Sequence, residues 1–580
     1  MGKIVGIDLG TTTSAIAVYE NGKPRVIADA DFKTDEGFAP RIIPTAVYRA
    51  SLNSQYSVGY DARDRVGCAR EFKRQMGEDI GISLGAEERS PEELSALVLR
   101  HLLDSAERDL GERPERAVIT VPANWKNEAR QATKNAGRLA GLEVERLINE
   151  PTAAAIAYGI RPDTDGKTIA VYDLGGGTFD VTILEIEDRV FNVRTSVGDP
   201  KLGGSDFDRL LAEHVLAQQG NGALTLEKLG KLPGGEKSVH ALKLQCEKAK
   251  KTLSRTRTAS VRAPFVIPGQ PAGIDVDVSR ATLIELIDPL VQRSIEYVHK
   301  ALRNANLKPG DIDTVVLAGG STRIPHVRAL LSELFGQEPD TSLNPDEAIT
   351  LGAATQAWIM ESEPTADSPL VLDNVNSTLG VEVVGEIGGV PVEGLFSPIL
   401  AKDKKVPCRH TESYWTLHDQ QECISIEVFE GEDRFAKNNR KVSPLPVEID
   451  GLPRKPAGEV KIDITMGLTI DGTVDVEVAI EGEPRHSGAF QLVGSHYSAL
   501  ELERKRRELD ESWKTTALGK RYGKLLDSVQ LALETPRHST HHGALSAALA
   551  ELESAIQAGD EPAAESADLK LTDVMFDLDD

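Results

Sequence analysis

The chain has 580 residues, of which 40% are hydrophobic and 27% are charged, and its formal net charge is -25. A chain of this length is too long for one hydrophobic core, so we expect several domains. The composition is ordinary for a soluble globular protein, and the strongly acidic balance argues against a nucleic-acid-binding protein.

The four cysteines are Cys68, Cys246, Cys408 and Cys423. None forms a Cys-x-x-Cys pair or has metal-ligand spacing with a histidine, so we expect free thiols in a reducing compartment. The N-terminal sequence has no signal-peptide pattern, and no stretch is long enough to cross a bilayer. We therefore expect a cytoplasmic protein that does not act at a membrane.

The first motif is an apolar run that ends in an acid, Val5-Gly6-Ile7-Asp8. The small residues that follow it are Gly10, Thr11, Thr12 and Thr13. Glycine lets backbone N–H groups approach an anion closely, and a carboxylate can hold hydrated Mg²⁺ or orient a water molecule. The pattern indicates a β-strand that delivers Asp8 to a phosphate-binding turn, although a tight turn after a core strand would look similar.

The segments that follow alternate between strands and helices. Asn21-Gly22 predicts a hairpin turn. Ser90 before Pro91 and two acids predicts a capped helix that runs to about residue 110. Residues 117–121 predict a strand, and residues 127–140 predict a helix. This alternation predicts a layered α/β domain.

Glu150 stands directly before Pro151 and the alanine-rich helix predicted for residues 153–158. Its carboxylate could simply cap this helix. Alternatively, it could orient magnesium-bound waters or the attacking water.

The first motif returns at residues 170–180, where an apolar strand ends in Asp173. It is followed by Gly175, Gly176, Gly177 and Thr178. Three consecutive glycines cost backbone entropy and are rarely kept for a turn alone. Two such loops predict a duplicated fold that grips one nucleoside triphosphate from both sides.

A third glycine turn follows the apolar strand predicted for residues 314–317. Its residues are Gly319, Gly320 and Ser321, and the nearby Arg323 could stack on a purine ring. The basic helix predicted for residues 238–253 could form the opposite wall of a nucleotide pocket, although a solvated basic face is the simpler interpretation of its spacing. The candidate residues there are Glu247, Lys250, Lys251 and Ser254.

The composition changes at residues 361–369, which are rich in Pro, Ser, Thr and acids and are typical of a linker. An apolar segment and an acid follow, Leu370, Val371, Leu372 and Asp373. Short β-runs as far as about residue 492 predict an all-β domain. Helical patterns cover residues 498–534 and 544–557, and the acidic tail at 558–580 is expected to be disordered.

Together these motifs resemble the actin/hexokinase/heat-shock ATPase fold, and in detail the seventy-kilodalton heat-shock chaperones of the DnaK type. Further matching segments are residues 149–155, 202–204 and 344–348. The resemblance implies an α/β, duplicated actin/hexokinase-like ATPase domain, followed by an all-β sandwich that binds peptide and a shortened helical lid. The implied bounds are 1–363 for the ATPase domain, 364–373 for the linker, 374–496 for the sandwich, 497–557 for the lid and 558–580 for the tail.

The resemblance implies an ATPase that uses Mg²⁺, with K⁺ as a further candidate cofactor, and whose ATP/ADP cycle controls the binding of extended apolar segments of unfolded proteins. The implied catalytic residues are Asp8, Arg63, Glu150, Asp173 and Thr178, with Asp8 and Asp173 next to the metal. The implied nucleotide-binding residues are Gly10, Thr11, Thr12, Thr13, Gly175, Gly176, Gly177, Gly203, Glu247, Lys250, Lys251, Ser254, Gly319, Gly320, Ser321, Arg323 and Asp346.

One position departs from the family pattern. The family has a lysine that reaches the γ-phosphate within a Val-Gly-x-x-Ala-Lys pattern, whereas this chain has Arg63 at that place in residues 58–63. A guanidinium and an ammonium place charge differently, so we expect slower or less tightly coupled hydrolysis. Lys73 and Arg74 match a basic pair of the family and could compensate.

The resemblance also implies an allosteric path and a peptide groove. Pro122 would relay the nucleotide state between the lobes, the apolar linker would dock on the ATPase domain in one nucleotide state, and a J-domain co-chaperone would act near Arg146 and Asp373. A nucleotide exchange factor is a further implied partner. The implied peptide contacts are Val381, Val383, Val384, Leu417, Ile424 and Ile426, although period-two apolar residues are more often sandwich core.

Three alternatives remain at this stage. A sugar or metabolite kinase on the same fold would need a substrate carboxylate in the cleft and has no use for a β-domain with a lid. A filament-forming, actin-like protein is disfavoured by the long C-terminal extension. A specialised chaperone that serves few clients remains open because of Arg63 and the shortened lid, which predicts fast peptide release.

Overall fold

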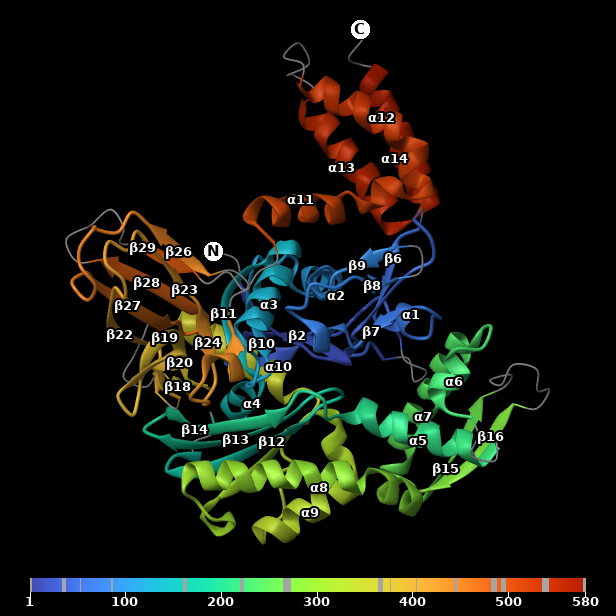
Figure 1. Cartoon of the computed structure of the whole chain (residues 1–580). Helices are drawn as coiled ribbons and strands as arrows, with labels where there is room; N and C mark the ends of the chain where they lie inside the picture. The colour runs from blue at the N-terminus through green and yellow to red at the C-terminus, as the bar shows by residue number, and fades with distance from the viewer. Residues whose placement is uncertain are drawn as a thin grey trace.

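The computed structural model describes the chain apart from residues 1–2, 34–37, 53, 85–86, 160–163, 220–223, 264–272, 363–368, 376, 403, 443–445, 481–487, 492–496, 535–541 and 577–580. Part of the expected linker, residues 364–368, and the last four residues of the expected tail therefore lie outside the described residues. Figure 1 shows two α/β lobes, a β-sandwich beside the first lobe and a group of C-terminal helices above it.

The first lobe is built on a mixed sheet in the order β11-β10-β1-β2-β3, with β4 paired to β2. Helices α2 and α3 pack against its apolar face. The sheet strands are β1 (Ile4–Leu9), β2 (Thr13–Glu20), β3 (Lys23–Val26), β4 (Ile43–Pro44), β10 (Arg116–Val121) and β11 (Glu143–Asn149). The remaining elements of this lobe are β5 (Ala46–Arg49), β6 (Tyr56–Val58), α1 (Tyr60–Arg63), β7 (Ala69–Arg70), the 3-10 helix η1 (Phe72–Gln75), β8 (Ile82–Ser83), β9 (Glu88–Arg89), α2 (Pro91–Leu110) and α3 (Asn127–Leu139).

The second lobe repeats this connectivity. β12 pairs antiparallel with β13 and parallel with β17, as β1 pairs with β2 and β10, so the expected duplication is confirmed. The sheet order is β17-β12-β13-β14-β18-β21. Its strands are β12 (Lys167–Leu174), β13 (Phe179–Glu187), β14 (Val190–Asp199), β17 (Thr314–Ala318), β18 (Leu370–Asn374) and β21 (Lys405–Val406). The surrounding elements are α5 (Gly204–Gln219), α6 (Leu226–Gly230), α7 (Gly235–Leu253), β15 (Thr258–Ala263), β16 (Ile274–Ser279), α8 (Arg280–Ala305), η3 (Pro309–Asp311), η4 (Gly320–Arg323) and α9 (Pro325–Phe335).

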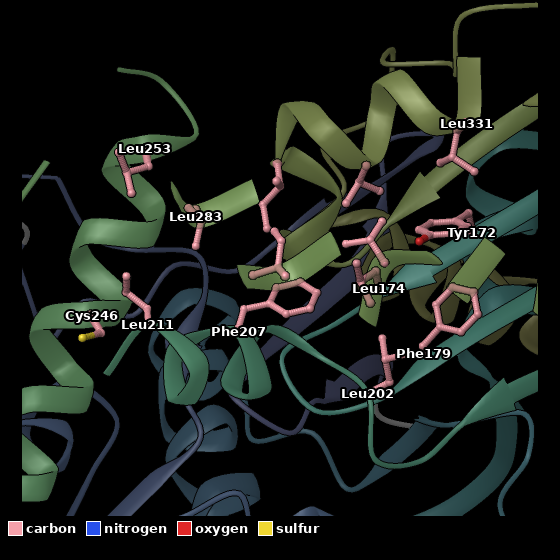
Figure 2. Packing of buried hydrophobic residues seen from close by; sticks show 14 of the residues in the cluster. Tyr172, Leu174, Phe179, Leu202, Phe207, Leu211, Cys246, Leu253, Leu283 and Leu331 are labelled. Atoms are coloured by element: carbon pink, nitrogen blue, oxygen red, sulfur yellow. The ribbon is translucent and has the colours of Figure 1, made fainter. Parts of the chain in front are cut away.

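Two helices, α4 (Glu150–Gly159) and α10 (Ala348–Glu361), join the lobes through one apolar cluster that contains strand residues of both sheets. Their backbones approach closely, because a Cβ on Gly352 would lie 1.7 Å from the carbonyl oxygen of Ala153. A second cluster packs against the second-lobe sheet, where the ring centroids of Tyr172 and Phe179 lie 4.8 Å apart and Phe207 of α5 lies further along the cluster (Figure 2). This packing supports the strand that carries Asp173.

Local sequence signals are confirmed in two places. The hairpin turn between β2 and β3 has positive φ at Asn21 (53°) and Gly22 (77°), which suits the Asn-Gly pair. Helix α2 begins after Ser90, whose side chain accepts from the N–H of Glu93, while the Glu93 side chain accepts from the N–H of Ser90. This capping box satisfies two otherwise unpaired donors.

The β-sandwich that follows β18 confirms the expected all-β domain. Its two main sheets have the orders β20-β19-β24-β25 and β22-β27-β28-β29, and β23 pairs with β26. The inner faces share one apolar core. The strands are β19 (Leu379–Ile387), β20 (Val390–Leu400), β22 (Cys408–Trp415), β23 (Cys423–Ile426), β24 (Val428–Glu430), β25 (Arg440–Lys441), β26 (Val447–Asp450), β27 (Lys461–Leu468), β28 (Val474–Ile480) and β29 (Gly488–Gln491), with η5 (Ala436–Asn438) after β24.

The prediction that the acidic tail is disordered is wrong for residues 561–576, which form a helix. The C-terminal helices are α11 (Ala499–Asp510), η7 (Ser512–Thr515), α12 (Ala517–Glu534), α13 (His542–Ala558) and α14 (Glu561–Phe576). Ala564, Ala567 and Leu571 lie three or four residues apart and are fully buried in a cluster formed by α12, α13 and α14. The helical region therefore extends past the expected limit at residue 557. No helix in the described ranges is both long enough and apolar enough to span a membrane.

The packing of this cluster predicts which leucine of α14 stabilises the α12–α14 bundle. Leu571 is fully buried and Leu569 is 69% exposed. Leu571→Ala should lower the free energy of unfolding of the α12–α14 bundle by about 2–5 kcal/mol, because it leaves a cavity, whereas Leu569→Ala should change it by less than about 0.5 kcal/mol. Native-state hydrogen exchange of the α13 and α14 amides in the full chain measures both. Equal effects of the two substitutions would contradict this packing.

Candidate active site

A cavity of about 1020 Å³ lies between the two lobes and is lined by residues of both. Twenty of the predicted catalytic and nucleotide-binding residues line it. They are Asp8, Gly10, Thr11, Thr12, Thr13, Arg63, Glu150, Asp173, Gly175, Gly176, Thr178, Glu247, Lys250, Lys251, Ser254, Gly319, Gly320, Ser321, Arg323 and Asp346. Gly203 packs against the second glycine loop at Gly177, since a Cβ on Gly203 would sit 2.5 Å from the backbone nitrogen of Gly177.

The two glycine loops face each other across the cavity. A Cβ on Gly176 would lie 2.3 Å from Cγ2 of Thr12, and a Cβ on Gly177 would lie 2.3 Å from Cγ2 of Thr11. Any larger residue at these positions would push the loops apart. The close contact explains two of the three successive glycines.

The third glycine turn packs against the strand that carries Asp173. Gly319 has φ +78°, and a Cβ there would lie 2.8 Å from Oδ1 of Asp173 and 2.4 Å from the carbonyl oxygen of Leu174. Both the backbone conformation and the space therefore require glycine. Ser321 reaches the second loop, donating from Oγ to the Gly175 carbonyl at 2.9 Å.

Four carboxylates gather at the floor of the cavity around one ammonium. Glu150, Asp173 and Asp180 are buried, Asp8 is partly buried, and Lys73, only 2% exposed, pairs with Glu150. Burial, reinforced by the Glu150 charge, raises the pKa of Asp8 to about 6, against the opposing effects of Lys73 and of a hydrogen bond from Thr120. Burial likewise raises the pKa of Asp173 and of Asp180, again with Glu150 adding to the effect. One ammonium does not balance this much negative charge.

The donor set suits a hydrated cation. Among the described residues, no three or more His, Cys, Asp or Glu side chains converge as direct ligands of a metal ion. Both carboxylate oxygens of Asp180 are buried and have no hydrogen-bond partner in the described structure. Oxygen ligands that leave room for waters and substrate phosphates are what Mg²⁺ prefers. Asp8 and Asp173 are therefore the residues that could hold such an ion.

In the described contacts Arg63 pairs outside this cluster, and its predicted catalytic role stays a prediction. Its Nη2 lies 3.3 Å from Oε2 of Glu247 on α7, so it joins the two lobes at the rim of the cavity. Although burial acts to raise the pKa of Glu247, Lys251 and Arg63 lower it to about 2. Lys73 is the cation next to the carboxylates. The difference arises because α1 ends at Arg63 on the side of the lobe that faces α7, whereas η1 places Lys73 under Glu150.

The other charged residues of the cavity are held by neighbours. Lys250 donates to the Gly204 carbonyl and to Oδ2 of Asp208, both at 2.8 Å. Burial raises the pKa of Asp208 to about 6, although Lys250 acts to lower it. Arg323 is paired with Asp346 at 2.6 Å, which orients its exposed guanidinium at the opening.

The apolar end of the linker, residues 370–373, is a strand of the second-lobe sheet. In β18, Val371 lies opposite Phe191 of β14, in parallel register, and is only 6% exposed. Asn149 donates from Nδ2 to Asp373 and accepts from Arg130 at 2.6 Å. Leu370 is half exposed and Leu372 is partly buried.

The remaining expected allosteric residues are Pro122 and Arg146, both in the first lobe. Pro122 directly follows β10, and its carbonyl accepts from the N–H of Trp125 at 3.1 Å. Arg146 is buried on β11, and burial lowers its pKa, an effect that the charges of Asp373 and Asp471 oppose.

The β-sandwich and α11 are both docked on the first lobe. Asp471, in the turn between β27 and β28, pairs with Lys134 at 2.6 Å and accepts from the N–H of Leu147 at 3.1 Å. On α11, Lys505 pairs with Glu93 at 3.0 Å. These contacts could not be predicted from the sequence, because single charged residues carry no information about a partner more than 300 positions away.

The expected peptide contacts fall into three groups. Val381 and Ile426 are buried in the sandwich core, with exposed fractions of 2% and 6%. Val383 and Ile424 are partly buried against that core. Val384 and Leu417 are exposed. In this conformation Val381 and Ile426 are sandwich core residues, which is the simpler interpretation of the alternating apolar pattern.

Duplicated sheets, facing glycine loops and an attached β-sandwich define a two-lobed ATPase with an associated peptide-binding module. A family model described as Hsp70 protein matches residues 4–515, from β1 to the end of η7. The chain therefore belongs to the Hsp70 family. It is an ATPase that binds ATP and ADP and an ATP-dependent chaperone that binds unfolded polypeptides. The predicted fold class and function are confirmed, and the kinase and filament alternatives are set aside.

The positions of Lys73 and Arg63 predict different defects. Lys73→Met should slow single-turnover ATP hydrolysis by about 100-fold or more, because it removes the cation beside the carboxylates. Arg63→Ala should change single-turnover hydrolysis by less than about threefold but speed nucleotide release, because it removes a link between the lobes. Single-turnover assays and stopped-flow release of a fluorescent nucleotide measure the two effects. If Arg63→Ala slows hydrolysis as much as Lys73→Met does, this prediction is contradicted and Arg63 has the catalytic role that the family resemblance implies.

Proposed function

We propose that hydrolysis of Mg-ATP between the two lobes controls the grip of the β-sandwich on extended apolar peptides through strand β18. The observation that carries the proposal is a continuous set of contacts from the cavity to this strand. Lys73 pairs with Glu150, and the neighbouring Asn149 donates to Asp373 on β18. A change in charge around Glu150 can therefore reach the segment that joins the two domains.

In this proposal each group around the cavity has one task. Asp8 and Asp173 hold the hydrated Mg²⁺, which supplies positive charge to the phosphates, and the unpartnered carboxylate of Asp180 is a candidate for K⁺. Lys73 faces the γ-phosphate and Glu150 orients the attacking water. The Gly10–Thr13 and Gly175–Thr178 loops offer N–H groups and hydroxyls to the phosphates. Arg323 and α7 contact the nucleoside.

The proposed coupling depends on how the domains are held together. The docked arrangement uses β18 in the second-lobe sheet together with ion pairs such as Lys134 with Asp471 and Lys505 with Glu93. Both pairs are mostly buried. Removing charges from water costs free energy that offsets much of their attraction, so a modest change at the nucleotide can shift the balance between docked and undocked states. We assign weak peptide binding to the docked state and tight binding to the undocked state.

The domain division follows from this proposal, with the ATPase domain at 1–363, the linker at 364–373 and the sandwich at 374–496. The helical lid begins at 497 and includes α14. A J-domain co-chaperone at the surface near Arg146 and Asp373 and a nucleotide exchange factor are the proposed partners. A cytoplasmic location is supported by the four cysteines, all of which are free thiols.

The coupling is tested with Val371→Asp. A carboxylate at this buried strand position should prevent β18 from pairing with β14, because a buried unpaired charge is costly. Basal ATP turnover should remain within about twofold, while its stimulation by an apolar peptide should be lost. Steady-state turnover with and without an extended apolar peptide measures both quantities. Leu370→Asp, at an exposed position of the same strand, is the matched control and should keep most of the stimulation.

The metal assignment is tested by removing the ion. Asp8→Asn should reduce the gain in ADP affinity that Mg²⁺ provides by about tenfold or more, because it removes one negative charge from the ion's surroundings. In EDTA the same variant should bind ADP at least as tightly as the wild type, because repulsion between Asp8 and the phosphates is gone. Calorimetric titration of ADP under both conditions separates the two effects. Weaker binding in EDTA as well would assign Asp8 a structural role.

A further inference from the structure

The second glycine loop is held from both lobes. The carbonyls of Gly175 and Gly176 accept from the first two N–H groups of α5, at 3.0 and 2.8 Å, within the second lobe. The Gly177 carbonyl accepts from Arg74, at 3.0 Å from Nε and 2.6 Å from Nη2. Arg74 belongs to η1 of the first lobe, so this guanidinium crosses the cleft.

The same guanidinium also holds the beginning of α5. Nη2 of Arg74 donates to Oδ2 of Asp206 at 2.8 Å, and this oxygen accepts from the N–H of Gly203 at 3.0 Å. One planar group therefore joins η1, the glycine loop and the first turn of α5. Such a fork requires two N–H groups fixed in one plane, which an ammonium on a flexible chain cannot offer.

Packing shows how tightly the loop is pressed against the first lobe. A Cβ on Gly177 would lie 2.8 Å from Nε of Arg74 and 2.3 Å from Cγ2 of Thr11. The Arg74 side chain lines the cavity and is 20% exposed. Its neighbour Lys73 reaches Glu150 from the same short helix, so η1 contacts both the carboxylate cluster and the loop.

We propose that Arg74 is a positioning residue for ATP hydrolysis. Its guanidinium holds the Gly175–Thr178 loop against the first lobe, so that the loop meets the phosphates in one geometry when the cleft closes. This inference rests on the proposed role of the loop in phosphate binding. A direct contact of Arg74 with the γ-phosphate would also use the guanidinium fork, and its loss would weaken ATP binding as well as hydrolysis. The positioning role instead predicts slower hydrolysis with a smaller change in ATP affinity.

The test uses Arg74→Lys and Arg74→Ala in the full chain. Arg74→Lys keeps the charge and loses the fork, so it should slow single-turnover hydrolysis by about tenfold or more, nearly as much as Arg74→Ala, with a smaller change in ATP affinity. Millimolar guanidinium ion should partly restore Arg74→Ala, whereas a merely structural defect would not respond. Arg65→Lys, at an exposed arginine outside the cavity, is the control and should be neutral.

A double-substitution cycle tests the partner. Asp206→Asn weakens the acceptor of the fork, so combining it with Arg74→Lys should slow hydrolysis no further than Arg74→Lys alone. Near wild-type hydrolysis in Arg74→Lys, or additive losses in the double variant, would overturn the proposal. Thermal unfolding of each variant checks folding, and Arg74→Lys keeps the test decisive if Arg74→Ala does not fold. Failure of the proposed function would be distinguishable, because the wild type would then hydrolyse ATP without stimulation by an apolar peptide, whereas the Arg74 variants are compared by single-turnover hydrolysis alone.

Discussion

The central constraint in this molecule is the gathering of four carboxylates, Asp8, Glu150, Asp173 and Asp180, around the single ammonium of Lys73. Burial is the main cause of the raised pKa values of the three aspartates, and repulsion from the Glu150 charge adds to it. A cation bound with phosphates relieves this repulsion, so closure of the lobes and occupation of the cleft favour each other. The glycine loops, the bridging arginines and the docked strand all surround this cluster.

Much of the ATPase fold could be predicted because its signals are local. A strand that ends in an acid before glycines, an Asn-Gly turn and a capped helix each depend on a few adjacent residues, and the structure contains them where the sequence places them. The tail was missed because its acidity outweighed a sparse apolar stripe. Ala564, Ala567 and Leu571 form a helix face that becomes stable only when α12 and α13 cover it.

The sequence predicts which residues line the candidate site better than it predicts which of these residues contact one another. Each of the two glycine loops and the third glycine turn follows its own strand, and this pattern predicts that all three line one cavity, as they do. The partner of Arg63 could not be derived, because Glu247 lies 184 positions away on the other lobe. The docking of Asp471 on the first lobe is equally invisible in the sequence. Such contacts depend on how folded domains pack against each other, and not on the pattern of neighbouring residues in the sequence.

The last three helices form a hydrophobic cluster of their own. This cluster lies beyond residue 515, where the family match ends, and a described contact with the first lobe is a hydrogen bond of 2.9 Å from Gln55 to the carbonyl of Ile556. A unit with its own core can loosen or rearrange without disturbing the packing around the nucleotide cleft. Substitutions inside this cluster are therefore expected to change the local stability of helices α12–α14 and leave the hydrolysis of ATP between the two lobes intact.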